Sequence, residues 1–532
     1  MTSIGEALVT QLAERGVDTV FGIPGVHTVE LYRGLAASGI RHVTPRHEQG
    51  AGFMADGYAR VSGKPGVAFV ITGPGLTNTL TPMAQARADS VPMLVVSGVN
   101  SLPSLGKGLG CLHELPNQQA MVSTVALVSA QVRKGDELTS ALNKAFLPFS
   151  SGRPGPTHIE IPLDVAGADY DVIADNAETD PQAAADRDQI SQAVNALQAA
   201  KSPVILAGGG SVRAAGLLRD LAERLDAPVV QTVNARGIMH GHALGVPASP
   251  SLRAVRDLIE GADVVLAVGT ELGPTDYDMY ATGSMAQMQG LIRIDCCQEQ
   301  INRHPAEIAL HGGAAATLAA IAADIRHKNP PAGAGADRAA QARTAAFEEL
   351  GPDYQSQVQV LDAMRDAAPA ALMVGDSTQP IYAGNLYYDH DRAGGWFNAA
   401  TGYGALGYGI PAAIGASIAA PGTRVICIVG DGGAQFSLPE VMAAVDEKLP
   451  IIFVVWNNHG YREIATSMQD VGVTVVGCDP TPPNFEATSL SFGIPHQRCT
   501  TDPQAVAAAV TACADITGPS MIEIEAPVFT PS

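Results

Sequence analysis

The sequence predicts an α/β protein of three doubly wound domains, each built around a parallel sheet. Short apolar runs bounded by Gly and Pro alternate with helix-like stretches throughout the 532 residues, as is typical of strands buried on both faces of a parallel sheet. Two segments interrupt this alternation: residues 166–188 are acidic and Ala-rich, and residues 329–349 are rich in Pro, Gly and Ala. We therefore expect domains at 1–165, 189–328 and 350–532, joined by these two linkers.

The elements follow in order. Ser3 and Glu6 have the spacing of a capping box, and Gly16 can end the helix that they begin. Residues 19–25 predict a short strand that runs into a turn. Further buried strands are expected within residues 66–75, 92–98 and 157–165 of the first domain, 202–210, 262–270 and 290–296 of the second, and 371–378, 424–433, 449–458 and 520–527 of the third.

One predicted helix, within residues 46–60, begins with an acid, Glu48, and contains Gly50 and Gly52. Glycine destabilises a helix, so the two glycines indicate close approach of another chain segment. The apolar face of the helix would consist of Ala51, Met54, Ala55 and Tyr58.

Composition excludes several classes of protein. Hydrophobic residues make up 46% of the chain and charged residues 16%, which is enough apolar material for large cores. The net charge of -21 would repel phosphates and argues against nucleic acid as a partner. Seven scattered cysteines without a CxxC pair predict reduced thiols in a cytoplasmic protein and argue against zinc. We expect no signal peptide, because no basic stretch precedes an apolar run at the N-terminus, and no membrane span, because the apolar runs are too short to cross a bilayer.

The third predicted domain carries the motif with the clearest chemistry. One of its strands ends at Asp431 and the next along the chain ends at Asn458. The carboxyl ends of parallel strands share one edge of a sheet, so both side chains should lie together there. Carboxylate and amide oxygens suit Mg²⁺, and glycines allow phosphate to approach a helix N-terminus. Each motif alone is also an ordinary turn, but together they predict a magnesium diphosphate site that includes Gly430, Asp431, Gly432, Gly433 and Asn458.

This pair of motifs resembles the signature of thiamine diphosphate-dependent enzymes, in the branch of acetolactate synthase, benzaldehyde lyase and pyruvate decarboxylase. The resemblance covers nearly the whole chain, in the order pyrimidine-binding, central and diphosphate-binding domain. It implies thiamine diphosphate and Mg²⁺, with Asp431, Asn458 and the Gly460 carbonyl as metal ligands. Leu406 would bend the cofactor and the Gly404 carbonyl would accept from its amine. Further cofactor contacts would come from Ser377, Thr378 and Tyr461.

The same resemblance gives Glu48 a catalytic role. Family members have a glutamate here that contacts N1′ of the aminopyrimidine, so that the cofactor loses the proton on its thiazolium C2. His27 follows a strand-ending turn at a position where benzaldehyde lyase also has histidine. His113 and Glu114 depart from the Phe-Gln pair of acetolactate synthases, and His113 is a natural proton carrier. We expect Glu48, His27 and His113 to be catalytic.

Several stretches resemble a narrower group, the 5-guanidino-2-oxopentanoate (2-ketoarginine) decarboxylases. The implied reaction is non-oxidative release of CO₂ from that 2-oxo acid, giving 4-guanidinobutanal. Carboxylates bind guanidinium groups well, and the candidate substrate partners are Glu114, Glu271, Asp276, Asp278 and Glu463.

Alternatives remain at this point. A carboligase like acetolactate synthase or benzaldehyde lyase would share the cofactor chemistry. The glycines within residues 206–216 would suit a nucleotide-binding oxidoreductase, but they lack a well-spaced GxGxxG. A cofactor-binding protein without turnover is disfavoured by Glu48, Asp431 and Asn458. The sequence leaves open whether FAD binds the central domain. By resemblance we expect a homodimer or homotetramer whose sites are shared between chains, and the glycines at residues 50 and 52 would then mark close approach across a subunit interface.

Overall fold

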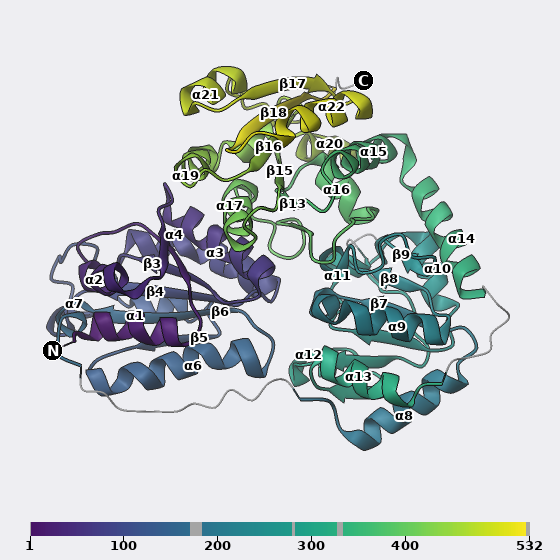
Figure 1. Cartoon of the computed structure of the whole chain (residues 1–532), viewed down its shortest axis with the longest axis horizontal. Helices are drawn as coiled ribbons and strands as arrows, with labels where there is room; N and C mark the ends of the chain where they lie inside the picture. Colours follow the sequence, from purple (N-terminus) through teal and green to yellow (C-terminus); the bar gives the residue numbers. More distant parts are fainter. Residues whose placement is uncertain (1, 171–182, 279–281, 327–333, 528–532) are drawn as a thin grey trace.

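The computed structural model describes residues 2–170, 183–278, 282–326 and 334–527. They form three α/β domains, each with a six-stranded sheet in which every strand pairing is parallel. The first and central domains lie side by side, and the third lies across both (Figure 1). The predicted fold class is therefore confirmed.

The first domain has the strand order β2-β1-β3-β4-β6-β5. Its first helix begins with the predicted capping box, since the Ser3 hydroxyl accepts the Glu6 N–H at 3.2 Å and the Glu6 carboxylate accepts the Ser3 N–H at 2.8 Å. The strands are β1 (Thr19–Gly22), β2 (Arg41–Val43), β3 (Gly66–Val70), β4 (Met93–Val99), β5 (Val128–Gln131) and β6 (Pro156–Pro162). The α-helices are α1 (Ile4–Glu14), α2 (Val29–Ser38), α3 (Glu48–Ser62), α4 (Pro74–Ala88), α5 (Gln118–Val122), α6 (Leu138–Ser151) and α7 (Leu163–Ala166).

The central domain has the order β12-β11-β10-β7-β8-β9. Its strands are β7 (Val204–Ala207), β8 (Val229–Gln231), β9 (Gly245–Val246), β10 (Val265–Val268), β11 (Ile292–Asp295) and β12 (Ile308–His311). Its α-helices are α8 (Arg187–Ala199), α9 (Ala215–Leu225), α10 (Arg253–Glu260), α11 (Pro274–Tyr277), α12 (Gln298–Arg303) and α13 (Ala314–Asp324).

The third domain has the order β14-β13-β15-β16-β18-β17. Its strands are β13 (Leu372–Gly375), β14 (Trp396–Asn398), β15 (Val425–Gly430), β16 (Ile451–Asn457), β17 (His496–Thr500) and β18 (Ser520–Glu525). Its helices are α15 (Gly351–Ala367), α16 (Gln379–Leu386), α17 (Gly409–Ala419), α18 (Asp431–Ala434), the 3₁₀ turn η5 (Leu438–Glu440), α19 (Val441–Asp446), α20 (Arg462–Asp470), α21 (Phe485–Phe492) and α22 (Pro503–Ala514).

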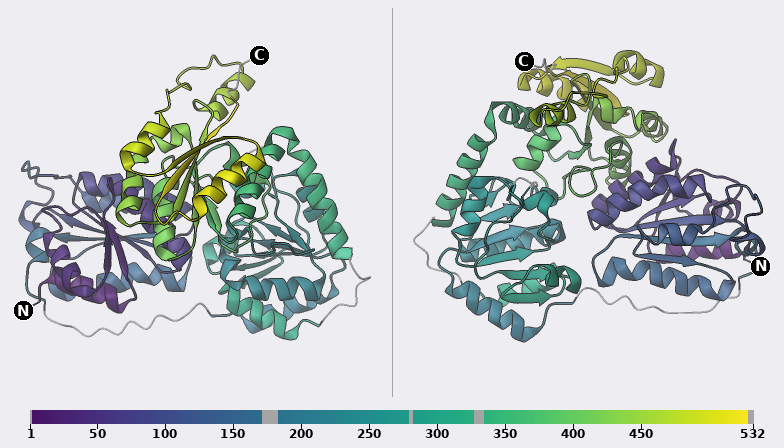
Figure 2. Two further views of the ribbon diagram at one scale, coloured as in Figure 1. Left: turned by 45° about the horizontal axis from the view of Figure 1, so that its top comes forward. Right: turned by 180° about the vertical axis from the view of Figure 1, so that it is seen from behind.

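Most of the second predicted linker is a helix. Residues 334–349 form α14 (Ala334–Glu349), which with α15 leads from the central domain to the third (Figure 2). Ala339, Ala342 and Ala346 are buried at helical spacing in the same core as α10 residues. Small alanine side chains give a weak hydrophobic signal, and for this reason the segment resembles a linker in sequence. Of the first predicted linker, residues 171–182 lie outside the described residues.

The glycines of α3 allow close packing within the chain. A Cβ on Gly52 would collide with Pro82 of α4, and one on Gly57 would collide with the Ala412 carbonyl of α17. Gly415 of α17 packs equally closely against α3. The expectation that the helix glycines mark a subunit interface is therefore wrong, because Gly52 packs inside the first domain and Gly50 meets Glu440 of the same chain. The predicted apolar face of α3 is buried in the core that joins the first and third domains.

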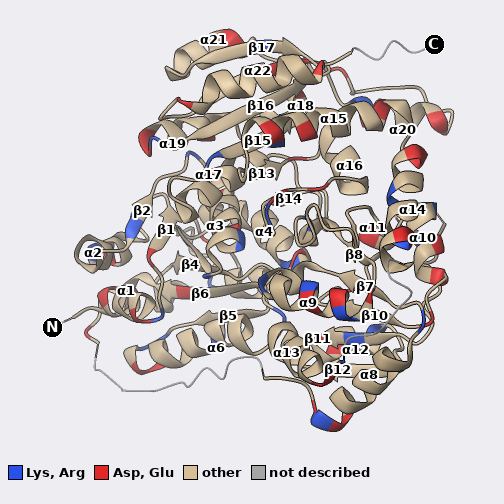
Figure 3. Ribbon diagram, turned by 45° about the vertical axis from the view of Figure 1, so that its right-hand side comes forward, with Lys and Arg blue, Asp and Glu red and all other residues tan. Residues whose placement is uncertain are grey.

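Charged side chains are spread over helices of all three domains (Figure 3). Among the described residues, no helix combines the length and hydropathy needed to cross a bilayer.

Candidate functional site

Asp431 and Asn458 follow neighbouring strands, as the sequence predicts. Gly430 at the end of β15 is in register with Trp456 near the end of β16. The Asp431 carboxylate accepts the Asn458 N–H at 3.3 Å and the Gly460 N–H at 3.0 Å. Burial raises the pKa of this carboxyl, and the two N–H donors lower it.

Three oxygens converge at this point. Nδ2 of Asn458 donates to Oε1 of Gln379 at 3.0 Å, and Nε1 of Trp456 donates to the same Oε1 at 3.0 Å, which identifies it as an acceptor. Oδ1 of Asn458 therefore faces the Gly460 carbonyl oxygen at 2.9 Å and Oδ1 of Asp431 at 3.1 Å. If the Asn458 amide were flipped, its oxygen would face Oε1 of Gln379, and two acceptor oxygens would lie against each other.

The spacing of these oxygens fits Mg²⁺. Oxygens on one edge of an octahedron with Mg–O distances of about 2.1 Å are about 3.0 Å apart. A cation among the three oxygens removes their mutual repulsion, so Asp431, Asn458 and the Gly460 carbonyl form a suitable ligand set for the metal.

The end of β13 adjoins the same place, since Gly375 is in register with Ile428 of β15. Thr378 is the N-cap of α16, and its hydroxyl lies next to Gly430. Gly432 lies against the Tyr461 ring, which leaves no room for a side chain at residue 432. Ser377 and Thr378 are thus held beside the glycine turn, in a position to contact a phosphate bound there.

A buried carboxylate, Asp376, holds the segment that contains Gly404 and Leu406. It accepts N–H groups from Ser377 at 2.8 Å, Gly407 at 2.8 Å and Gly409 at 3.4 Å. Gly404 and Gly407 have φ of 76° and 84°, in the left-handed region that favours glycine. Burial raises the pKa of Asp376 to about 6, while these N–H donors lower it.

The first domain holds this segment from the other side. The Gln85 side chain of α4 accepts the Ala405 N–H at 3.2 Å. Asp56 of α3 accepts from the Tyr408 hydroxyl at 2.6 Å and from Arg60 at 2.6 Å. Asp89 in turn accepts from Arg60 at 2.6 Å. This buried network fixes the predicted pyrimidine-binding segment to the C-terminal halves of α3 and α4.

We expect Asp376→Asn to weaken thiamine diphosphate binding by about 10- to 100-fold, the range for partners that orient a ligand-binding group. The asparagine amide replaces one acceptor oxygen of Asp376 with a donor, which would then face backbone N–H groups. Fluorescence titration of the cofactor-free protein measures the effect. Asp366→Asn on the exposed side of α15 is the matched control, and equal affinity of the two variants would contradict the assignment.

Glu48 is the first residue of α3, and His47 is the N-cap, whose Nδ1 accepts the Gln49 N–H at 3.1 Å. The Glu48 carboxylate accepts from Nδ2 of Asn78 at 3.0 Å. His47, and not Glu48, therefore caps the helix, and Asn78 of α4 orients the Glu48 carboxylate.

His27 and His113 are brought together from loops 86 residues apart in sequence. Their ring centroids are 5.4 Å apart. His27 is 5% exposed and its Nδ1 has no partner among the described residues. Burial, and then the charge of His113, lower the pKa of His27, which favours its neutral ring.

A buried glutamine, Gln118, anchors the neighbouring turn. Its Oε1 accepts from Thr72 at 2.7 Å and from the Gly73 N–H at 3.0 Å, and its amide donates to Glu160 at 2.9 Å. A Cβ on Gly73 would collide with the His113 carbonyl, so this turn supports the loop of His113.

Four of the five candidate substrate acids have other partners. Both oxygens of Glu114 accept N–H groups of its own loop, from Gly108 at 2.9 Å and Cys111 at 3.0 Å. Glu271 forms an ion pair with Arg153 at 2.9 Å. Asp278 accepts from Thr282 at 2.5 Å and from the Gly283 N–H at 2.8 Å.

The fourth of these acids, Asp276, accepts the Val233 N–H at 3.4 Å. Burial raises the pKa of Asp276 to about 6, and the nearby Arg236 lowers it. Glu463 lies in the first turn of α20, three residues after the predicted metal ligand Gly460. Its carboxylate has no hydrogen bond or ion pair among the residues that the structure describes. Its charge acts on two tyrosines, since burial first and then Glu463 raise the pKa of Tyr382 and Tyr354.

The central domain uses its glycines for packing. A Cβ on Gly208 would collide with the Gly269 carbonyl, and the Gly210 N–H donates to that carbonyl at 3.0 Å. The glycine cluster within residues 206–216 is thus explained by contact with the turn after β10, without a dinucleotide.

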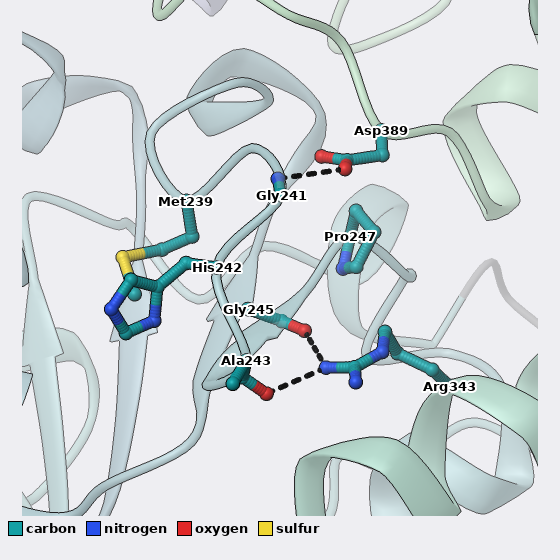
Figure 4. A pocket seen from close by; sticks show the side chains of 8 residues that line it. All are labelled: Met239, Gly241, His242, Ala243, Gly245, Pro247, Arg343 and Asp389. Atoms are coloured by element: carbon teal, nitrogen blue, oxygen red, sulfur yellow. Dashed lines mark hydrogen bonds between the residues drawn. The ribbon is translucent and has the colours of Figure 1, made fainter. Parts of the chain in front are cut away.

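A recess of about 190 Å³ lies between the central domain, α14 and Asp389 (Figure 4). Arg343 donates to the carbonyls of Ala243 at 2.8 Å and Gly245 at 2.7 Å. The lining of the recess includes none of the predicted site residues. The hydrogen bonds of Arg343 join α14 to the central domain.

Sequence reasoning missed Asn78, Asp376 and Gln118. Asp376 had a local signal, because an acid beside the predicted phosphate contact Ser377 is unfavourable unless backbone N–H groups neutralise it. Asn78 and Gln118 had none, because their partners lie far away in sequence.

Comparison with known proteins agrees with this arrangement. The sequence matches the N-terminal TPP binding domain of thiamine pyrophosphate enzymes over residues 2–121, their central domain over 190–321 and their C-terminal TPP binding domain over 376–524. Thiamine pyrophosphate is thiamine diphosphate, the cofactor that the motifs imply.

Curated relatives extend over most of the chain. The protein is 42% identical to "Probable 2-ketoarginine decarboxylase AruI" of Pseudomonas aeruginosa, over 92% of this chain and 88% of the relative. It is 32% identical to an acetolactate synthase of Mycobacterium bovis, over 85% and 75%. It is 29% identical to the acetolactate synthase isozyme 1 large subunit of Escherichia coli, over 85% and 81%. The chain therefore belongs to the thiamine pyrophosphate enzymes.

Proposed function

We propose that the protein is a thiamine diphosphate-dependent 2-oxo acid decarboxylase that converts 5-guanidino-2-oxopentanoate to 4-guanidinobutanal and CO₂. The observation that carries the proposal is the 42% identity to a protein named as a 2-ketoarginine decarboxylase, against 32% or less for the acetolactate synthases compared above. The differences from acetolactate synthases at His113 and Glu114 favour the same choice over a carboligase.

The chain's own residues would divide the work as follows. The bound cofactor supplies an electron sink for loss of CO₂. Asp431, Asn458 and Gly460 hold Mg²⁺, and Ser377 and Thr378 bind the terminal phosphate. Gly430, Gly432 and Gly433 let the diphosphate approach the backbone, while Gly404, Leu406 and Tyr461 shape the rest of the cofactor site.

Three residues would carry out proton transfer. Glu48 holds or releases a proton at N1′ of the aminopyrimidine, oriented by Asn78. His27 and His113 lie close enough together to serve one reacting carbon as acid and base.

Glu463 is the best candidate partner for the substrate guanidinium. What supports it is a carboxylate with no hydrogen bond or ion pair among the described residues, three positions after the predicted metal ligand Gly460 and near Tyr382 and Tyr354. Carboxylates and aromatic rings together suit a guanidinium group. Glu114, Asp276 and Asp278 are weaker candidates, because other groups already satisfy them.

We expect Glu463→Gln to raise KM for 5-guanidino-2-oxopentanoate by about 10- to 100-fold, because a charge-assisted hydrogen bond contributes about 1.5–3 kcal/mol. KM for 2-oxohexanoate, which lacks the guanidinium, should stay the same. Steady-state kinetics with both acids measures the difference. A proportional rise for both substrates would contradict the role.

We further propose a homodimer or dimer of dimers whose sites are shared between chains. Within one chain the pyrimidine-binding segment contacts Asp56 and Gln85, whereas Glu48 lies about 12 Å away along α3 from Asp56. This separation, together with the family resemblance that implies sites shared between chains, supports a Glu48 contributed by a second copy.

Mixing two inactive variants tests this assembly. Chains with Glu48→Gln and chains with Asp431→Asn would each lack activity alone. In a mixed dimer with shared sites, one of the two sites has both native residues, so random reassociation should restore about 25% of wild-type activity. Sites formed within one chain would stay inactive in every combination.

Reconstitution tests the reaction itself. The cofactor-free protein is supplied with thiamine diphosphate and Mg²⁺, and CO₂ and aldehyde are measured from 5-guanidino-2-oxopentanoate. We expect equal amounts of both products, and none without the cofactor. Formation of acetolactate from pyruvate as the main reaction would contradict the proposal.

A further inference from the structure

A buried carboxylate of the third domain, Glu440, lies at the start of the helix that carries Glu48. Oε1 of Glu440 accepts the N–H groups of Arg46 at 3.1 Å and His47 at 2.9 Å, and Oε2 accepts the Arg46 N–H at 2.9 Å. The residue is 2% exposed. N–H groups before and within the first turn of a helix have no intrahelical partner, and here a residue about 390 positions away supplies one.

Gly50 makes room for this carboxylate. A Cβ at residue 50 would collide with Oε1 of Glu440. The glycine that weakens the first turn of α3 is therefore a requirement of the contact with Glu440.

Glu440 is itself firmly placed. It ends η5 and leads into α19, and its N–H donates to the Ser437 carbonyl at 2.9 Å. Beside it, Asp446 forms an ion pair with the Arg46 side chain at 2.5 Å and Glu447 one with Arg41 at 2.5 Å. Those two pairs are partly exposed and contribute little, whereas the Glu440 contacts are buried.

The two carboxyl groups lie close enough to affect each other. Burial raises the pKa of Glu440 to about 7, the N–H groups of Arg46 and His47 lower it, and the charge of Glu48 raises it further. Because Glu48 directly follows Arg46 and His47 in the chain, a shift of their backbone also moves Glu48.

We propose that Glu440 is a positioning residue for Glu48: it fixes the backbone of Arg46 and His47 so that the Glu48 carboxylate is held where it meets the cofactor. This inference rests on the proposed role of Glu48 in the thiamine diphosphate-dependent decarboxylase. Asn78 orients the Glu48 side chain, and Glu440 fixes the backbone from which it extends.

Glu440→Gln tests the inference, because its amide places a donor against the Arg46 N–H. A misplacement of about 1 Å lowers catalytic rates by about 100-fold, so we expect kcat to fall by about 10- to 100-fold, with KM within about threefold. Exchange of the cofactor C2 hydrogen for deuterium, followed by NMR without substrate, should slow by a similar factor. Glu440→Asp, which keeps the charge, should recover part of the rate.

Two further variants complete the design. Gly50→Ala should reproduce the slow C2 exchange by displacing the Glu440 carboxylate, and Glu447→Gln, which loses an exposed ion pair between the same domains, should leave the rate unchanged. Amide hydrogen exchange at Arg46 and His47 in the cofactor-free protein should accelerate in Glu440→Gln and Gly50→Ala only.

The outcomes separate this inference from the proposed function. Faster amide exchange at Arg46 and His47 with unchanged C2 exchange would make Glu440 purely structural and overturn the inference. Slow C2 exchange in a protein that does not decarboxylate 5-guanidino-2-oxopentanoate would support the inference and contradict only the substrate. If Glu440→Gln does not fold, Glu440→Asp and Gly50→Ala decide by the same C2 measurement.

Discussion

Glu48→Gln is expected to lower kcat by about 10²- to 10⁴-fold, the contribution typical of a positioned general acid or base. Glutamine has nearly the same shape and can still accept from Asn78, so α3 and its packing should persist. It holds no transferable proton, and the loss should fall on kcat more than on KM. Steady-state CO₂ release with saturating thiamine diphosphate and Mg²⁺ measures this.

The control for Glu48→Gln is Glu30→Gln, an acid on α2 whose partner is the exposed Arg33. It should leave kcat within about twofold of wild type, as surface substitutions usually do. Unchanged turnover in Glu48→Gln would remove this residue from the mechanism.

Asp431→Asn is expected to abolish Mg²⁺-dependent cofactor binding, with metal affinity reduced by more than about 100-fold, since even outer partners of metal ligands contribute 10- to 100-fold. Asp431 is fully buried, and burial raises the pKa of its carboxyl, so the neutral amide should fold at least as stably without cofactor. Calorimetric scans should show Tm unchanged for the cofactor-free variant.

The same scans with ligand complete the test. A ligand at 100 times its Kd stabilises the folded state by about 2.7 kcal/mol, so the wild type should gain Tm with Mg²⁺ and thiamine diphosphate while Asp431→Asn should not. Asp470→Asn at the end of α20 is a nearby control. Full ligand-induced stabilisation of Asp431→Asn would contradict the metal site.

Most inner strands of the sheets could be predicted because burial on both faces makes them continuous apolar runs, whereas the inner strand β8, of only three residues, was not predicted. Strands β15 and β16 illustrate this, since all of their residues are buried. The edge strands β2 and β17 carry no such signal, because they are partly exposed and contain polar residues. Helix α14 was missed for a related reason, because its buried stripe consists of alanine.

The candidate site likewise contains some contacts that the sequence predicts and others that it does not. Asp431 and Asn458 could be predicted together because consecutive parallel strands set them side by side. The meeting of His27 with His113, and of Glu440 with the start of α3, depends on packing between distant segments. A single sequence contains no local trace of either contact, apart from the glycine at residue 50 whose purpose only Glu440 explains.

The central claim is that this thiamine pyrophosphate enzyme decarboxylates a 2-oxo acid with a guanidinium at its far end. The most direct measurement is kcat/KM for CO₂ release from 5-guanidino-2-oxopentanoate, compared with 2-oxohexanoate, pyruvate and benzoylformate under the same conditions. A site that pairs a charged group rejects analogues without it strongly, so we predict a preference of at least about 100-fold for the guanidino acid. Equal values for the guanidino acid and 2-oxohexanoate, or a preference for pyruvate with acetolactate as the product, would contradict the account.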